Sequence, residues 1–484
     1  MVKKIFVGLL GVVLVITGVV LFNTFTFTST QKTFTPRQVT KISESSLKHF
    51  QEAIHFQTIS YGDSLKFDSA QFNAFHRYLR ATYPLVHKTM SVQTVSGYSL
   101  IYKWEGKNPS LKPYILMAHQ DVVPIEEASR QRWTVDPFAG IIKDNFIWGR
   151  GTADDKINLI SIMEAAEKLI AENFQPGRTI YLAFGHDEEV GGKGATAMAH
   201  WFTGKNITAE MILDEGGVIT KEKIPGVKKP VALIGTAEKG YLSLELSVEI
   251  SGGHSSMPEK ETSIDLLTKA ITKLRANPFD AKLTGPMKGF MKSVGPEMSF
   301  TARMVFANPW LFKKMIYSTY EKSGGGNAML HTTLVPTIIQ AGIKDNVIPT
   351  VALATINLRL LPGDGSLEMI DRIKKIIGDE RIKINPVGRI SEASAVSSTD
   401  SFAFDQVDEA IKESYPDVVS SPFLMIGATD SRHLKEVSNN IFKFSPMFDP
   451  FGFHGIDERV SLESYQTSIF FFENLMRNTL QLKP

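Results

Sequence analysis

The chain has 484 residues, 43% of them hydrophobic and 21% charged, which is the composition of a globular protein long enough for two compact folded units. The formal net charge of +2, without a long basic block, argues against a nucleic-acid partner. The lack of cysteine excludes disulfides, thiolate metal ligands and thiol nucleophiles, so any metal must be held by His, Asp and Glu.

The N-terminal segment is predicted to enter a membrane. Two lysines precede an uncharged, mainly apolar run, Ile5–Phe22, which as a helix is about 27 Å long and just spans a bilayer core. The lysines favour an N-terminus left inside and a body carried outside. We expect residues 1–22 to be an uncleaved anchor, because no small-residue cleavage site follows the run; a cleaved signal and a secreted protein are the alternative. Residues 23–40 are expected to form a tether.

Residues 41–239 contain short apolar runs that alternate with helical spacing. Tyr114–Ala118 and Arg178–Phe184 have the pattern of buried strands, and Ile157–Ile170 between them has that of a helix. This alternation predicts an α/β fold with a mainly parallel sheet. Residues that follow such strands gather at the carboxyl edge of the sheet, where ligands bind.

The pattern changes at residue 240 to an alternation of apolar and polar residues with period two. It is clear over residues 241–250 and 350–359 and predicts half-exposed strands. Helices are predicted at residues 263–275 and 367–377. We therefore expect residues 240–390 to form an α+β domain, with an antiparallel sheet and helices on one face. It is inserted into the first domain, which resumes over residues 391–484.

Polar residues at the ends of the apolar runs supply a candidate metal centre. The ligand candidates are two histidines and three carboxylates: His119, Asp154, Glu189, Asp214 and His454. This mixture suits a pair of zinc-like divalent ions, whose +4 charge is balanced by the three carboxylates and a bridging hydroxide. Taken singly, Asp154 could be only a helix cap and His454 only a surface histidine. The common geometry of all the segments favours the metal centre.

Two further acidic residues have predicted supporting roles. Asp121 lies two residues after His119 on the same side of an extended segment, where it can orient the imidazole. Glu188 is left over beside Glu189 and is the candidate general base. Paired ions activate a water molecule and polarise a carbonyl, and Glu188 would take the water proton and deliver it to the leaving amine. The sequence therefore predicts a hydrolase.

Three strings of residues, Trp148–Lys156, Gly427–His433 and Asn440–Pro446, resemble the co-catalytic zinc aminoacylase/carboxypeptidase family. The resemblance covers residues 45–484 and is greatest to the subgroup of carboxypeptidase S and the secreted N-fatty-acyl-amino-acid hydrolase/synthase. It implies a zinc-exopeptidase catalytic domain and an inserted lid domain, which in many members is also a dimerisation surface through which a homodimer can form. It also implies two Zn²⁺ ions, with Co²⁺ or Mn²⁺ as alternatives, on the five ligands listed above.

The resemblance also implies substrate contacts. His254 would stabilise the oxyanion, often across a dimer, and Asn346 and Arg359 would help to hold the substrate through its carboxylate. Arg432 is a further carboxylate-binding candidate, although a structural pair with Asp430 explains it equally well.

The expected reaction is cleavage of an amide beside a free carboxylate, in short peptides or N-acyl amino acids. A non-catalytic binding or scaffold protein on the same fold is the alternative. The Met- and Phe-rich segment 287–320 could line an acyl tunnel, but an apolar stripe is more often a packed core.

Overall fold

The computed structural model describes residues 2–37 and 41–481; the parts of the predicted anchor, tether and C-terminal segment at residues 1, 38–40 and 482–484 lie outside it. Its main sheet has the strand order β1-β2-β6-β3-β7-β17-β9-β16, with β8 beside β9. In that order the strands are Ser91–Val95, Ser99–Trp104, Ile180–Gly185, Tyr114–His119, Met211–Asp214, Ile441–Lys443, Val231–Glu238 and Val419–Met425, and β8 is Ile219–Thr220.

The centre of this sheet is parallel. Strands β6, β3, β7 and β17 pair in parallel, so their carboxyl ends meet at one edge. At the two sides the pairs β1–β2, β2–β6 and β17–β9 are antiparallel. The predicted α/β fold with a mainly parallel sheet is confirmed, although the sheet as a whole is mixed.

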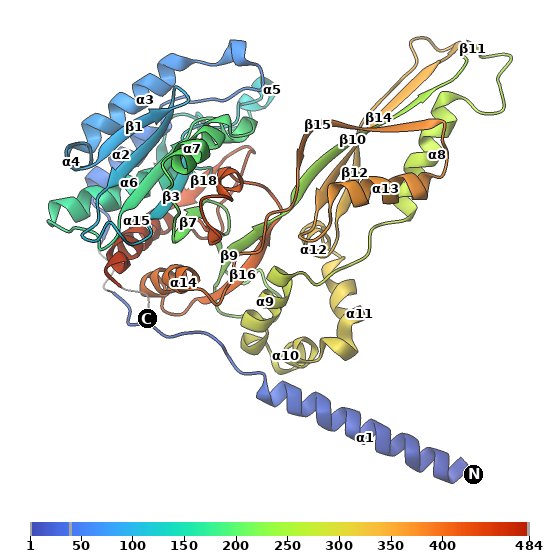
Figure 1. The fold of residues 1–484 in the computed structure, drawn as a ribbon, viewed down its shortest axis with the longest axis horizontal. Coiled ribbons are helices and arrows are strands. Elements are labelled where there is room, and N and C mark those ends of the chain that lie inside the picture. The colour runs from blue at the N-terminus through green and yellow to red at the C-terminus, as the bar shows by residue number, and fades with distance from the viewer. Residues whose placement is uncertain (1, 38–40, 482–484) are drawn as a thin grey trace.

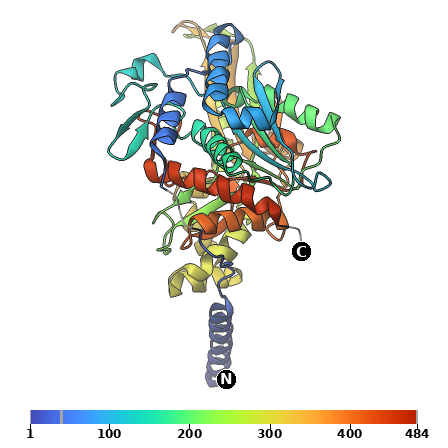
Figure 2. The same cartoon turned by 90° about the vertical axis from the view of Figure 1, so that its left-hand side faces the viewer.

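Alternate side chains of the central strands pack against helices on opposite faces of the sheet. Leu116 and Leu182 belong to a core shared with α6 and α15, whereas Ile115 and Met117 pack with α7. Figure 2 shows α15 and α14 lying side by side on one face. The helices of this part are α2 Glu44–Ile54, α3 Ser69–Thr82, α4 Pro84–Thr89, α5 Glu127–Arg130, α6 Lys156–Ala171, α7 Lys193–Gly204, α14 Phe402–Ser414 and α15 Leu462–Arg477. A small sheet, β18-β5-β4, comprises Arg459–Ser461, Phe146–Trp148 and Ile141–Lys143.

A second sheet stands apart from the first (Figure 1). Its order is β12-β14-β10-β15 and all its pairs are antiparallel. Buried residues of β14, at every second position, form one core with α8 and α13. Its elements are β10 Gly240–Glu249, α8 Ser263–Ala276, β12 Thr333–Ala341, β14 Val351–Leu360, α13 Ser366–Ile377 and β15 Ile382–Ser391; the short pair β11 Gly253–His254 and β13 Val347–Ile348 lies at its far tip. The strands and helices predicted between residues 241 and 377 are present.

Four helices between α8 and β12 form a helical insertion, residues 285–330, at the base of the molecule. They are α9 Gly285–Val294, α10 Phe300–Ala307, α11 Pro309–Tyr320 and α12 Gly324–Leu330. Their buried Met and Phe side chains pack on Val231 of β9 and Val419 of β16. Beside them α1, Val2–Thr26, projects from the body and is long and apolar enough to cross a membrane.

Candidate metal centre

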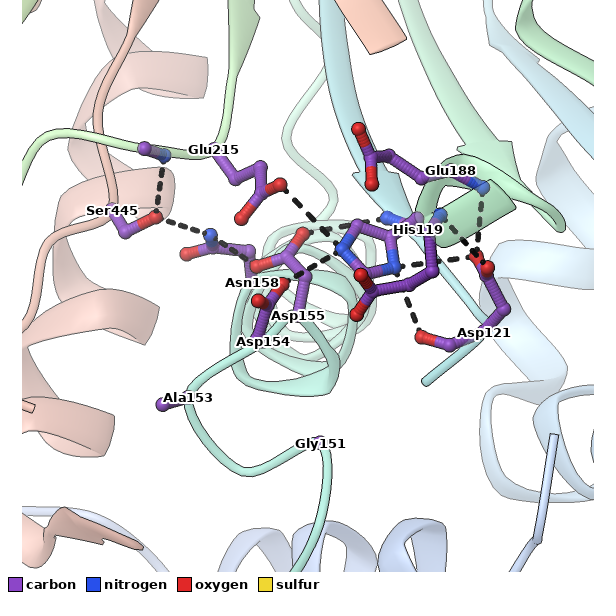
Figure 3. A network of polar contacts seen from close by, with 12 residues as sticks. His119, Asp121, Gly151, Ala153, Asp154, Asp155, Asn158, Glu188, Glu215 and Ser445 are labelled. Atoms are coloured by element: carbon purple, nitrogen blue, oxygen red, sulfur yellow. Dashed lines mark hydrogen bonds and ion pairs between the residues drawn. The ribbon is translucent and has the colours of Figure 1, made fainter. Parts of the chain in front are cut away.

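His119 is the last residue of β3 and is almost completely buried at the carboxyl edge of the sheet. Its Nδ1 lies 2.9 Å from the backbone oxygen of Asp121 and 3.3 Å from Asp121 Oδ1. Its Nε2 points the other way, 2.9 Å from Asp154 Oδ1 and 3.5 Å from Glu215 Oε1 (Figure 3). The Asp121 carboxylate also accepts the backbone N–H groups of Glu188 and Glu189, each at 3.2 Å. Asp121 therefore holds both His119 and the next acidic segment in place.

Asp154 lies on a loop that Glu458 organises from the far end of the sequence. The fully buried Glu458 carboxylate accepts the backbone N–H groups of Gly151, Ala153 and Asp154 at 2.8–3.2 Å. It also pairs with Arg150 at 2.6 Å. Sequence reasoning missed Glu458, because a lone glutamate four residues after His454 carries no motif.

The Asp154 carboxylate lies between the two histidines. Its Oδ1 faces His119 Nε2, and its Oδ2 lies 3.0 Å from His454 Nε2. The same His454 nitrogen is 3.1 Å from Glu189 Oε2. Potential ligand atoms of His119, Asp154 and Glu189 all lie within 4.8 Å of one another. Four of the five predicted ligands thus meet, in an arrangement that suits a carboxylate shared by two ions.

The fifth predicted ligand, Asp214, is buried at the end of β7 with its carboxylate turned to the backbone. Its oxygens accept the N–H groups of Glu215 at 3.0 Å and Ser431 at 2.7 Å. The neighbouring Glu215 reaches His119 instead, and with Asp155 it forms a second cluster around that histidine. Strand β7 ends at Asp214, so the side chains of Asp214 and Glu215 point in different directions. Glu215 is therefore a competing ligand candidate, which the Asp-Glu-Gly segment could have suggested.

Glu188 stands beside the cluster on the short helix η2, Glu188–Val190. Its carboxylate is 3.5 Å from Arg432 Nη1, on the short helix η4, Asp430–Leu434. The alternative partner of Arg432, Asp430, has two buried oxygens without a hydrogen-bond partner among the described residues. Arg432 therefore contacts the predicted base in this structure.

The electrostatics of the cluster fit bound cations. Burial, and then the charge of Asp154, raise the pKa of Glu215 to about 8. Burial and the charge of Asp430 raise the pKa of Glu188 well above its usual range. Hydrogen bonds to Asp154 and Glu189 raise the pKa of His454 to about 10. Glu189 Oε1 is buried without a hydrogen-bond partner among the described residues. Divalent cations would offset this excess of buried negative charge and give the free oxygen a partner.

The predicted substrate-binding residues separate into two groups. His254 is on β11 and Asn346 is one residue before β13, so both lie at the far tip of the second sheet, away from β3 and β7 (Figure 1). Within one chain the structure does not bring them to the cluster. Arg359, on β14 near the connection between the sheets, is close enough to Arg432 for their charges to interact, and its guanidinium lies 4.7 Å from the Tyr241 ring centroid.

Sequence reasoning also missed Arg389, on β15. Its Nη1 donates to the Gly191 oxygen at 3.2 Å, which joins the second sheet to the segment that carries Glu188. Its charge interacts with those of Arg432 and Glu188. Arg432 of η4 and Arg389 of the second sheet thus both interact with the predicted base.

Comparison with known proteins identifies the family. Residues 115–478 match peptidase family M20/M25/M40. The chain is 41% identical to probable carboxypeptidase S-like 2 of Dictyostelium discoideum, over 97% of this chain and 92% of that one. It is 34% identical to the human N-fatty-acyl-amino acid synthase/hydrolase PM20D1, over 92% of this chain and 89% of that one. The chain therefore belongs to the M20/M25/M40 peptidase family and is a hydrolase of the metallopeptidase type.

Solved structures share the fold. An M20 family metallo-carboxypeptidase from Sulfolobus solfataricus superposes with a TM-score of 0.64 at 18% identity, covering 91% of this chain and all of that one. Human carnosine dipeptidase 1 gives 0.61 at 13% identity, covering 91% and 96%. A Bacillus subtilis M20 protein, described as a dinuclear metal-binding peptidase, gives 0.55 at 14% identity, covering 90% and 98%.

Proposed function

We propose that this chain is a two-metal amidohydrolase that cleaves an amide bond next to a free carboxylate, in short peptides or N-acyl amino acids. One observation carries the proposal: the Asp154 carboxylate lies between His119 and His454, and Glu188 stands beside this cluster on the segment that Asp121 anchors. The relatives are named for carboxypeptidase activity and for N-fatty-acyl-amino acid hydrolysis, and both reactions have this bond and this charged end in common.

The ions are assigned to side chains as follows. His119 and Glu215 would hold one ion, Glu189 and His454 would hold the other, and Asp154, which lies between the two histidines, would contribute to both. Asp214, the carboxylate expected for the first ion, instead fixes the turn that carries Glu215. Imidazole and carboxylate ligands suit zinc and also accept cobalt or manganese. Bound ions of this kind acidify a water molecule and polarise the scissile carbonyl.

Glu188 is the proposed general base. It takes a proton from the attacking water and returns it to the leaving nitrogen, so that an amide and water become a carboxylate and an amine. Asp121 fixes its position through the backbone N–H of Glu188. Arg432 contacts the Glu188 carboxylate and opposes the rise in its pKa that burial causes.

The cationic side of the site is proposed to hold the substrate carboxylate. Arg432 comes from the main sheet domain, and Arg359 and Arg389 come from the second sheet. The mutual repulsion of their charges is relieved when an anion binds between them. A planar guanidinium pairs with a carboxylate in two parallel hydrogen bonds, which explains a preference for substrates with a free acid.

We further propose that residues 240–390 act as a lid and dimerisation domain between the two catalytic segments, 41–239 and 391–484. His254 and Asn346 at its tip would then complete the site of a second copy. Helix α1 is proposed to anchor the protein in a membrane with the catalytic body outside the cytoplasm.

A substrate panel tests the reaction. Metal-loaded wild type, Glu188→Gln and a surface control, Glu463→Gln, are incubated with dipeptides and with N-acyl amino acids of several chain lengths. Glu188→Gln is expected to keep its metal and lose about 10²–10⁴-fold in kcat, whereas the control stays within a factor of two. Unchanged turnover in Glu188→Gln would remove Glu188 from the mechanism. No hydrolysis of any member by wild type would refute the proposed function.

A further inference from the structure

The end of helix α1 is built into the helical insertion. Asn308, which is completely buried, donates from its side-chain amide to the Val20 oxygen at 3.2 Å. Its Oδ1 accepts the Asn23 side chain at 2.9 Å. The Phe25 and Phe300 rings lie 5.9 Å apart. These contacts fix where the chain leaves the bilayer, because the apolar run of α1 ends at Phe22.

The helical insertion exposes apolar side chains close to the point where α1 would leave the bilayer. Trp310 is 56% exposed, and its indole N–H donates to Asn308 Oδ1 at 3.3 Å, beside Asn23. Phe300, Leu311 and Met315 on α10 and α11 are also exposed. Tryptophan prefers the boundary between hydrocarbon and headgroups, and lysines at such a boundary reach the headgroups. Lys313 and Lys314, both exposed on α11, supply such charges.

A cavity of about 520 Å³ opens within the same helices. Its walls are mainly apolar and include Ala302, Met315 and Ile316 of the insertion and Leu233 and Phe423 of the main sheet. The volume lies within the range of about 300–1,000 Å³ that is typical of small-molecule sites. Met315 belongs both to the exposed face and to the cavity wall, so the cavity reaches the face beside α1.

The inner wall of the cavity adjoins the chain segment that follows Glu215. The backbone N–H of Leu233 donates to the Val218 oxygen at 3.0 Å. The chain passes Gly217 so closely that a Cβ there would overlap the Leu233 oxygen. Glu215, which faces His119, is two residues before Gly217. The cavity therefore extends from the face beside α1 toward the segment that carries Glu215.

We propose that the helical insertion rests in the surface of the bilayer that α1 crosses, and that its cavity receives the hydrocarbon tail of an N-acyl amino acid dissolved in that bilayer. This inference rests on the proposed function and selects long-chain N-acyl amino acids over peptides. The tail enters between α10 and α11, and the polar end reaches the metal centre. Each methylene moved from water into an apolar site increases binding about fourfold, which makes chain length the basis of specificity.

Membrane contact is tested with full-length protein in phosphatidylcholine vesicles whose acyl chains carry bromine, a quencher of tryptophan fluorescence. We expect brominated vesicles to quench wild type clearly more than Trp310→Phe, because Trp310 is the indole placed against the lipid. Trp201→Phe, which removes a partly exposed indole from α7, is the matched control and should be quenched as strongly as wild type. Equal quenching in wild type and Trp310→Phe would overturn the membrane contact. A light-scattering mass that falls from dimer in wild type to monomer in Trp310→Phe would also overturn it, because a second copy would then cover this face.

The tail site is tested by filling the cavity. Ala302→Phe is compared with Ala302→Ser for hydrolysis of the N-palmitoyl and N-acetyl forms of one amino acid. We expect Ala302→Phe to lower kcat/KM for the palmitoyl substrate at least tenfold and to leave the acetyl substrate within twofold; Thr319→Phe narrows the same cavity if Ala302→Phe does not fold. If the ratio of kcat/KM for the palmitoyl substrate to kcat/KM for the acetyl substrate is the same in Ala302→Phe and Ala302→Ser, the tail site is overturned. The proposed amidohydrolase activity is not affected by that result. Wild type that cleaves dipeptides but neither N-acyl substrate also overturns the tail site, whereas wild type inactive on dipeptides and on both N-acyl substrates refutes the proposed function instead.

Discussion

The chemistry of the site depends first on which of two adjacent residues stands beside His119. Asp214 is buried at the end of β7, and Glu215, whose side chain is 13% exposed, follows it directly. The Asp214 carboxylate is occupied by two backbone N–H groups, whereas the Glu215 carboxylate lies within 3.5 Å of the imidazole. These contacts support the proposal that Glu215 is the ligand and that Asp214 shapes the turn.

Paired substitutions separate these roles. Glu215→Gln is expected to weaken one metal site at least tenfold, because a neutral amide replaces a charged ligand. Asp214→Asn keeps one acceptor for the backbone and is expected to retain both ions with lower stability. Chelator competition with metal counting measures both variants. Loss of metal from Asp214→Asn, with Glu215→Gln unaffected, would restore Asp214 as the ligand.

Lys239 gives a pH dependence at the connection between the two sheets. Burial and the charge of Arg359 lower its pKa to about 7, although Asp364 opposes this and its ammonium donates to the Ala328 and His331 oxygens. Above pH 7 the unfolded chain holds this proton more tightly than the folded one, so the contribution of Lys239 to stability rises with pH.

We expect the stability of wild type relative to Lys239→Met to increase between pH 7 and 9, by at most about 1.4 kcal/mol per pH unit. Below pH 7 the group is protonated in both states and the difference is constant. Denaturant unfolding of both proteins at each pH gives the curve. A difference that falls with increasing pH would show that the pKa is not lowered.

At the scale of secondary structure elements, strands and helices could be predicted wherever periodicity was strong. β10, β14, α8 and α13 form where their alternation or helical spacing predicts them, because each buries one regular face. The carboxyl ends of the parallel strands β3 and β7 also bring His119 and Asp214 to one edge as expected. The side-chain direction of Glu215 could not be predicted, because periodicity stops where the strand ends.

The loop before α6 shows how one distant residue determines an element of the site. Glu458→Gln removes the charge that holds the N–H groups of Gly151, Ala153 and Asp154 and the Arg150 guanidinium. We expect metal affinity to fall about 10–100-fold, as for other residues that orient ligands, although no ligand is changed. Metal titration compares it with Glu463→Gln, whose exposed carboxylate contacts Lys221 and the Tyr415 hydroxyl, away from the metal cluster. Identical affinities would show that the loop holds its shape unaided.

At the scale of the whole molecule, the position of the second sheet could not be inferred from sequence. His254 and Asn346 carry recognisable motifs, but they lie at the tip farthest from the cluster, because the angle between the sheets is set at the connection near Lys239. There Glu238 and Ser394 are joined by hydrogen bonds of 2.8 Å and 3.1 Å, so the two crossing segments lie side by side.

Mixed dimers test whether the tip serves a partner. Glu188→Gln and His254→Ala are each expected to be nearly inactive, but a randomly mixed sample should regain about a quarter of wild-type kcat. Half of the dimers then contain one chain of each variant. In such a dimer one of the two sites combines Glu188 of the His254→Ala chain with His254 of the Glu188→Gln chain. Light scattering confirms that dimers form. Dimers that regain no activity would show that His254 acts within its own chain, and a His254→Ala variant that is active by itself would show that His254 has no catalytic role.

The central claim is that residues from five distant segments hold two divalent ions. Elemental mass spectrometry of purified full-length protein, with activity followed through chelation and metal replacement, tests it most directly. The account predicts two ions per chain, loss of activity with the metal, its return on readdition, and reduced metal content in His119→Ala. Full activity in protein from which chelation has removed all transition metal would contradict it.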